Sequence, residues 1–334
     1  MSVMNVRRQH ISGIAVAAAA ALGLGTLSAC SSDSAAAGNT EKFDVVASFY
    51  PMQFLAEQIG GDHVKVATLT EPGQEPHDLE VSAQQRAQIE ESDAALYLKG
   101  LQPAVDEAVT QSGVKTKIDA ATLTELEDHG SLEDSHEHGG EEAHAEEGHA
   151  AEEGHSEEEE HALDPHVWLD PVKYAEVAKG VGAAFEKADP DHAADYKKNT
   201  DALVKKLNGL NTEFEDGLRN TKSKVFFTNH AAFGYLAERY GLTQEAISGL
   251  DPESEPSPAR IKELQQEAKA DGVTTVFYET LVSDKTAKTL ADDAGLKTDV
   301  LDPLEGITDK SKGDDYFEVM AANLTALKTA LGAK

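Results

Sequence analysis

Residues 128–161 form a stretch from which no packed core can be built. They hold seven histidines and fourteen acidic residues but almost no aliphatic side chains, and no lysine or arginine occurs between residues 118 and 172. Ordering one residue costs roughly 1–2 kcal/mol of backbone entropy, which such a segment cannot offset by burying apolar surface. The composition therefore predicts a solvated, disordered loop over residues 128–162 that interrupts the folded chain.

The same stretch has the chemistry to hold metal ions weakly. Imidazole suits zinc, copper, nickel and iron, and the surrounding carboxylates attract cations even without a rigid cage. A solvated acidic linker with incidental histidines is the alternative, but the repeated Glu-Glu-Gly-His units argue against accident. The candidate low-affinity ligands are His129, His136, His138, His144, His149, His155 and His161.

The N-terminus has the layout of a secretory signal. Arg7 and Arg8 form a short basic region, residues 11–29 are apolar and rich in alanine and leucine, and Leu-Ser-Ala-Cys closes the stretch at 27–30. The stretch is too short and too weakly flanked to span a membrane in the mature protein. Residues 1–29 are therefore predicted to be a signal peptide.

Cys30 is the only cysteine of the chain, so no intramolecular disulfide can form. It stands where the resemblance to a bacterial lipoprotein signal places the lipidated residue, and several acyl chains together make a stable anchor. We therefore expect an extracytoplasmic protein anchored to the cell membrane through a lipid on Cys30, with residues 30–41 as a flexible tether.

The charge of the chain excludes one class of partner. The formal net charge is −32, of which residues 128–161 contribute −14, and a surface this acidic does not bind nucleic acid. About 300 residues remain after the signal, which is more than one hydrophobic core usually serves, so two lobes are expected.

Strand-like and helix-like patterns alternate on both sides of the histidine-rich stretch. The strand candidates are 43–49, 64–69, 94–98, 224–228, 243–248, 273–278 and 298–301, and the helix candidates are 52–59, 83–91, 171–188, 189–220, 232–240, 257–270, 284–294 and 315–331.

This alternation predicts an α/β fold of two similar lobes, each a mostly parallel sheet flanked by helices. Residues 42–188 would form the N-terminal lobe and residues 221–334 the C-terminal lobe. Residues 189–220 would be one long helix between them, about 45 Å in length at 1.5 Å per residue. Ligands of such sheets bind at the carboxyl ends of the strands.

Three histidines and one aspartate fall at the ends of these elements. His77 follows the second strand, His166 enters a helix, and His230 follows the strand that ends at residue 228. Asp302 comes directly after the last strand. The spacings of 89, 64 and 72 residues rule out a local zinc finger or a His-Glu-x-x-His helix, so only the fold could assemble a shared site. Three imidazoles and one carboxylate suit zinc, whereas manganese favours more oxygen.

Four segments together resemble a known family. They are Glu-Pro-His at 75–77, Asp-Pro-His-Val-Trp-Leu-Asp-Pro at 164–171, Asn-His-Ala-Ala-Phe-Gly-Tyr-Leu-Ala-Glu-Arg-Tyr-Gly-Leu at 229–242 and Leu-Asp-Pro-Leu at 301–304. With the acidic insert before the second segment, the chain resembles the zinc-specific solute-binding lipoproteins of metal ABC importers, from about Phe43 to Leu331.

The resemblance implies an extracytoplasmic receptor, monomeric and not an enzyme. It would capture Zn²⁺ in the cleft between two lobes and deliver it to the permease of an ABC importer. The implied metal ligands are His77, His166, His230 and Asp302. Glu75 is a candidate accessory ligand, because some zinc members use a carboxylate near the first histidine, or water, in place of the aspartate. The helix at 189–220 would be the family's rigid interdomain helix.

Three alternatives stay open at this point. A manganese- or iron-binding receptor of the same family would carry more oxygen ligands, as do relatives with a glutamate in place of His230. A secreted zinc hydrolase would need three protein ligands and an open position, with Asp302 as a base. An adhesin that carries metal for stability is the third. Trp168, Phe233 and Tyr235 are expected to pack beneath the site.

Overall fold

The computed structural model describes residues 42–129 and 163–334. The predicted signal peptide, Cys30 and the tether lie outside the described residues, as do the candidate loop ligands from His136 to His161. Of the seven histidines in the acidic stretch, the described part of the chain contains His129.

The first parallel sheet lies in the N-terminal half. Its strands β1 (Phe43–Ala47), β2 (Val64–Thr68), β3 (Ala94–Tyr97) and β4 (Thr116–Asp119) are arranged in the order β2-β1-β3-β4. Val45 of β1 faces a central core, whereas its neighbour Val46 faces a second core on the opposite side of the sheet. Because helices cover both faces, β1 is apolar at every position except Asp44.

The helices of this half lie on opposite faces of the sheet. On the central side α1 (Tyr50–Gly60) and α4 (Pro171–Ala188) contribute to the central core, and on the other side α2 (Ala83–Glu91) and α3 (Pro103–Gln111) cover the second core. Three short 3-10 turns join these elements: η1 (Gly61–His63), η2 (Ala120–Thr122) and η3 (Val167–Leu169).

The second sheet repeats this plan in the C-terminal half. Its parallel strands β5 (Val225–Thr228), β6 (Thr243–Ala246), β7 (Thr275–Tyr278) and β8 (Lys297–Val300) follow the order β6-β5-β7-β8. Helices α6 (Gly234–Tyr240) and α9 (Tyr316–Ala330) contribute to the central core, while α7 (Pro258–Ala270) and α8 (Lys285–Ala294) enclose a third core. The prediction of two similar α/β lobes is confirmed.

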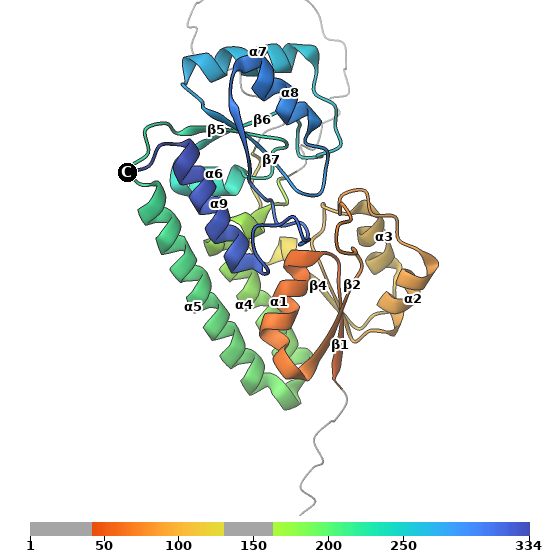
Figure 1. Cartoon of the computed structure of the whole chain (residues 1–334). Helices are drawn as coiled ribbons and strands as arrows, with labels where there is room; N and C mark the ends of the chain where they lie inside the picture. Colours follow the sequence, from red (N-terminus) through yellow and green to blue (C-terminus); the bar gives the residue numbers. More distant parts are fainter. Residues whose placement is uncertain (1–41, 130–162) are drawn as a thin grey trace, which may run out of the picture. The chain divides into compact units, whose positions relative to one another are not determined.

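A long helix connects the two halves. After the 3-10 turn η4 (Pro190–His192), α5 runs from Ala193 to Leu218 and contacts α1 and α4 of one half and α6 and α9 of the other. Figure 1 shows α5 alongside α4 and α9. The helix is shorter than the predicted 189–220, since Pro190 makes η4 first. Its buried residues recur at spacings of three, four and seven, as in Tyr196, Leu203, Leu207, Leu210 and Phe214.

Two elements of the first half were missing from the prediction, α3 and β4. Strand β4 buries one residue, Ile118, and its other three positions are polar or half-exposed, so its sequence shows no apolar alternation. An edge strand of this kind carries little sequence signal.

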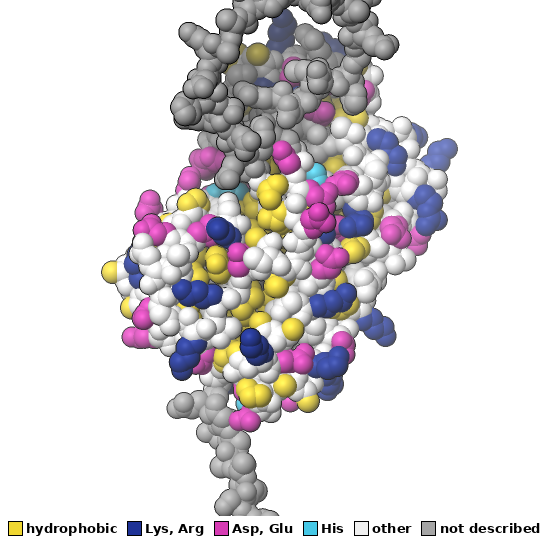
Figure 2. Space-filling model, turned by 180° about the vertical axis from the view of Figure 1, so that it is seen from behind, with side chains coloured by type: hydrophobic (Ala, Val, Ile, Leu, Met, Phe, Trp, Pro, Cys, Tyr) yellow, Lys and Arg dark blue, Asp and Glu magenta, His cyan; other side chains and the backbone are white. Residues whose placement is uncertain are grey.

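The surface is mixed in charge. Figure 2 shows acidic and basic side chains interspersed on the face seen from behind, with small hydrophobic areas between them. Within the described residues, no helix is both long enough and apolar enough to cross a membrane.

Candidate metal centre

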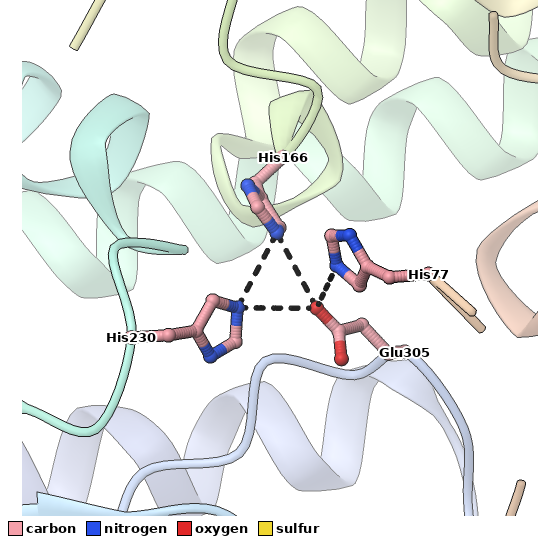
Figure 3. Close-up of side chains that lie close together, drawn as sticks. All are labelled: His77, His166, His230 and Glu305. Atoms are coloured by element: carbon pink, nitrogen blue, oxygen red, sulfur yellow. Dashed lines mark hydrogen bonds and ion pairs between the residues drawn. The ribbon is translucent and has the colours of Figure 1, made fainter. Parts of the chain in front are cut away.

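Three histidines and one glutamate from four separate loops converge on one point. His77 lies in the loop after β2, His166 directly before η3, His230 after β5, and Glu305 in the loop after β8. Each offers one ligand atom, and the four atoms all lie within 4.8 Å of one another. The strand ends of both sheets therefore supply this site, as expected for parallel sheets. Figure 3 shows the four side chains pointing toward one another.

The distances between these atoms fit a tetrahedral metal ion. Glu305 Oε1 lies 3.2 Å from His77 Nε2 and 3.3 Å from both His166 Nε2 and His230 Nε2. The Nε2 atoms of His166 and His230 are 3.4 Å apart. A tetrahedron with zinc–ligand bonds of roughly 2.0–2.1 Å has edges of about 3.3–3.4 Å. Four of the six edges thus already have the length that a zinc ion requires.

Most of the cluster is closed to solvent. His166, His230 and Glu305 are buried, whereas the side chain of His77 is 12% exposed. The second carboxylate oxygen of Glu305 is buried and has no hydrogen-bond partner among the described residues. A buried acceptor of this kind is costly unless a cation or a further donor reaches it. The cluster therefore suits a cation that enters past His77.

Two buried carboxylates orient two of the imidazoles. The Nδ1–H of His166 donates to Asp164 Oδ1 at 2.7 Å, and that of His230 donates to Glu279 Oε1 at 2.7 Å. With a hydrogen fixed on Nδ1, the neutral ring presents the lone pair of Nε2 to the centre of the cluster. Metal-binding histidines are usually held by such an outer carboxylate.

The ion-free cluster binds protons where a metal would bind. Burial acts to raise the pKa of Glu305, but the charge of His230 and hydrogen bonds from the three histidines outweigh it and hold that pKa well below its usual range. Burial acts to lower the pKa of His230, but the charges of Glu279 and Glu305 raise it well above the ordinary value. The pKa of His166 is also raised, since hydrogen bonds to Asp164 and Glu305 outweigh its burial.

Asp302, the carboxylate predicted as the fourth ligand, lies outside this cluster. Its Oδ1 accepts from the backbone N–H of Leu304 at 2.9 Å and its Oδ2 from the hydroxyl of Thr280 at 3.2 Å. Leu304 has a positive φ of 60°, and the turn directs the next residue, Glu305, into the site. The structure thus offers Glu305 rather than Asp302 as the carboxylate of the cluster, and Asp302 shapes the turn that carries it.

The sequence around Asp302 contained an indication that this residue shapes a turn. Each acidic residue in the pairs Glu75-Pro76, Asp164-Pro165, Asp170-Pro171, Asp251-Pro252 and Asp302-Pro303 accepts a hydrogen bond from the backbone N–H of the residue after the proline, at 2.8–3.0 Å. Proline fixes the backbone and the acidic side chain closes the turn. At these five positions the acidic side chain binds its own backbone, whereas Asp189, which also precedes a proline, bonds to Tyr196 and His192 instead.

Glu75 follows the same rule. Its two oxygens accept from the backbone N–H groups of His77 and Asp78, at 3.0 and 3.1 Å, and burial raises the pKa of its carboxyl group. The structure therefore places this candidate accessory ligand behind His77, outside the group of four.

Trp168 packs against the site as expected. Trp168 is fully buried, its ring centroid is 5.1 Å from that of His166, and its indole N–H donates to the carbonyl of Pro303 at 2.7 Å. This bond joins the loop of His166 to the loop of Glu305. His129 lies apart from the four, next to Asp164 and Glu238.

Comparison with known proteins places the chain in a family. Residues 45–330 match the model described as "Zinc-uptake complex component A periplasmic". Over 308 residues the chain is 37% identical to the zinc-binding lipoprotein AdcA of Streptococcus pneumoniae, covering 90% of this chain but 58% of that protein. The chain thus spans less than two thirds of the length of this relative. The Zn(II)-bound ZnuA-like domain of AdcA has a solved structure with a TM-score of 0.69, 34% identity, and coverage of 87% of this chain and 99% of that one.

Two further relatives match along nearly their whole length. The high-affinity zinc uptake system protein ZnuA of Bacillus subtilis is 36% identical over 329 residues, which cover 97% of this chain and 98% of the relative. The laminin-binding protein Lmb of Streptococcus agalactiae, described as bifunctional with adhesin and metal-transporting activity, has a TM-score of 0.73 at 30% identity, with coverage of 87% and 100%. The chain belongs to the family of periplasmic A components of zinc-uptake complexes.

Proposed function

We propose that the protein is an extracytoplasmic receptor that binds Zn²⁺ at His77, His166, His230 and Glu305 and delivers it to the permease of an ABC importer. The observation that carries the proposal is the set of ligand-to-ligand distances, 3.2–3.4 Å, around a point that four loops from both half-molecules surround. These are the edges of a zinc tetrahedron.

The donor set favours zinc over manganese or iron. Three imidazole nitrogens and one carboxylate oxygen form a borderline-soft, four-coordinate set, whereas Mn²⁺ prefers six oxygen-rich ligands. Copper binds such a set still more tightly, so the supply of metal outside the cytoplasm contributes to selectivity. The manganese or iron receptor is therefore the weaker alternative.

The geometry also favours binding over catalysis. A catalytic zinc ion keeps one coordination position open for water, whereas four protein groups fill the tetrahedron here. Asp302, which a hydrolase would need as a base, has one oxygen bonded to the backbone N–H of Leu304 and the other to the hydroxyl of Thr280. A receptor needs a closed site that can be emptied, and His77, whose side chain is 12% exposed, is the ligand through which the ion can leave.

The remaining parts of the proposal rest on sequence and family. The lipid on Cys30 would hold the receptor at the membrane beside the permease, and the histidine-rich residues 128–162 would raise the local zinc concentration near the site. We propose a monomer. An additional adhesin role is an open alternative, because the streptococcal relative Lmb is described as having one.

The test is zinc uptake by cells that depend on this receptor. Cells that carry the natural chain should accumulate zinc from a zinc-poor medium, and cells that carry His166→Ala should not, because the closed tetrahedron loses one ligand. His192→Ala is the matched control, since His192 is paired with Asp189 and belongs to no group that could hold a metal. Equal uptake by the His166→Ala and natural receptors would refute the proposed site.

A further inference from the structure

A second group of metal-binding side chains lies beside the first. Glu127, His129 and Glu238 each offer one ligand atom, and these atoms lie within 4.8 Å of one another. Glu127 directly precedes the histidine-rich residues 128–162, His129 is the first histidine of that stretch, and Glu238 comes from α6. The function proposed above includes His129 only among the histidines that raise the local zinc concentration, and it gives Glu127 and Glu238 no role.

The imidazole of His129 is held in the same way as those of the first site. Its Nδ1–H donates to Asp164 Oδ2 at 2.8 Å, while Asp164 Oδ1 accepts from His166 at 2.7 Å. Asp164 is fully buried and ionised, so it can only accept, and the hydrogen of His129 is fixed on Nδ1. The Nε2 of His129 therefore points outward, 2.9 Å from Glu238 Oε2. One buried carboxylate thus orients one histidine in each group.

Packing and hydrogen bonds in the surrounding fold fix the position of His129. A Cβ added to Gly234 would lie 2.5 Å from both Cβ and Cγ of His129, so the histidine packs where this glycine has no side chain. The ring of Tyr235 meets that of His129 edge-on at 4.3 Å. The Tyr235 hydroxyl accepts from the backbone N–H of Glu127 at 2.8 Å and donates to the carbonyl of Asp164 at 2.7 Å.

We propose that Glu127, His129 and Glu238 form a second, weaker zinc site next to the first. The proposal rests on the proposed function only in taking zinc as the metal. One imidazole and two carboxylates are ligands that zinc accepts, with water in the fourth position.

Two features make this site weaker than the first. The side chain of Glu238 is 61% exposed, so water competes for its carboxylate. Lys173 forms an ion pair with Glu127 and thereby neutralises one of the two carboxylates. A site that holds zinc loosely, and that shares Asp164 with the tight site, is suited to pass the ion inward.

The test measures zinc bound per chain by equilibrium dialysis. It uses the full chain with the six other histidines of the acidic stretch changed to serine: His136, His138, His144, His149, His155 and His161. This protein should bind two zinc ions, one tightly and one weakly. Glu238→Gln should lose the weak ion and keep the tight one, whereas Glu213→Gln, which removes an exposed carboxylate from α5, should keep both.

A second variant tests the site without removing a ligand. Gly234→Ala should displace His129 and lose the weak ion in the same way as Glu238→Gln. In crystals of the serine-substituted chain soaked with zinc, anomalous scattering at the zinc edge should give a second peak between Glu127, His129 and Glu238. If the serine-substituted chain bound only one zinc ion, or if its Glu238→Gln variant still bound two, this inference would be overturned. Neither result would contradict the proposed function. Loss of the tight ion from the parent chain would instead overturn the proposed function.

Discussion

At the scale of single residues, Glu305 and Asp302 show how two buried carboxylates three positions apart differ in role. Asp302 closes a turn through the backbone N–H of Leu304, whereas Glu305 meets three imidazoles and keeps one oxygen without a partner among the described residues. Asp302 was predicted as the ligand because it comes directly after the last strand. The proline after Asp302 was a signal for its role, because at five such positions of this chain the acidic side chain accepts from the backbone N–H after the proline.

This difference predicts opposite effects on zinc-dependent stability. Glu305→Gln should abolish most of the rise in melting temperature that zinc produces, because a ligand charge is lost. Asp302→Asn should cost about 1–3 kcal/mol of unfolding free energy with or without zinc, through a weakened buried turn, and should keep most of the zinc-induced rise. Thermal unfolding of both variants with and without zinc measures this. A zinc effect lost in Asp302→Asn and kept in Glu305→Gln would reverse the assignment.

The pKa shifts of the histidines set the pH dependence. Because the pKa values of His166 and His230 are raised in the ion-free protein, protons compete with zinc already above the unperturbed value of about 6.5. The stability from these protonated histidines is complete below about 6.5 and is lost as pH rises through their raised pKa values. Stability from Glu305, whose pKa is lowered, is present above about 4.5 and is lost as pH falls through the lowered value.

Zinc affinity should therefore fall steadily as pH decreases from 8 to 6, and zinc binding should release protons to the buffer. Isothermal titration in buffers of different ionisation enthalpy counts those protons, and chelator competition at each pH gives the affinity. A zinc affinity that stays constant between pH 8 and 6 would show that the histidines are not ligands.

At the scale of secondary structure elements, the sequence predicted most of the fold because hydrophobic periodicity marks each buried helix and strand. Helix α4 was predicted with its observed bounds, and the strands of the second sheet within three residues. Strand β4 was missed because it buries a single residue. Glu305 was missed because a loop has no hydrophobic periodicity from which the direction of a side chain could be predicted. The turn made by Asp302 and Leu304 decides where the side chain of Glu305 points.

The packing of α4 against α5 gives a matched test of two glycines. A Cβ on Gly182 of α4 would lie 2.2 Å from Thr200 Oγ1 of α5, whereas a Cβ on the exposed Gly209 would meet nothing within 4 Å. Gly182→Ala should destabilise the protein by about 1–3 kcal/mol through overpacking. Gly209→Ala should stabilise it by roughly 0.5–1 kcal/mol through helix propensity. Urea unfolding of the two variants measures both, and a stabilised Gly182→Ala would contradict the observed packing.

At the scale of the whole described molecule, one continuous core extends between the two sheets. It includes Phe43 of β1, Leu210 of α5 and Phe226 of β5. The proposed metal ligands come from loops on both sides of this core, with His77 from the first half and His230 and Glu305 from the second. Zinc therefore joins two halves that α5 and the core already hold together.

Such a shared core predicts small rearrangements on metal binding. Close-packed interiors resist sliding, so the radius of gyration measured by small-angle scattering should change by less than about 1 Å when zinc is added. Loops that carry His77 and Glu305 can adjust without moving the sheets. A larger decrease with zinc would mean that the halves rotate and that the core does not fix them.

The zinc affinity of His230→Ala tests the central claim most directly. His230 is buried, is oriented by Glu279 and supplies one of the four atoms of the cluster. Its loss should weaken zinc binding by more than the roughly 10–100-fold typical for removal of an outer-shell partner, while His192→Ala should bind zinc like the natural chain. Competition with a zinc chelator at pH 7.5 measures both variants. If the His230→Ala protein binds zinc with the affinity of the natural chain, the three-histidine site is not where the protein holds its metal.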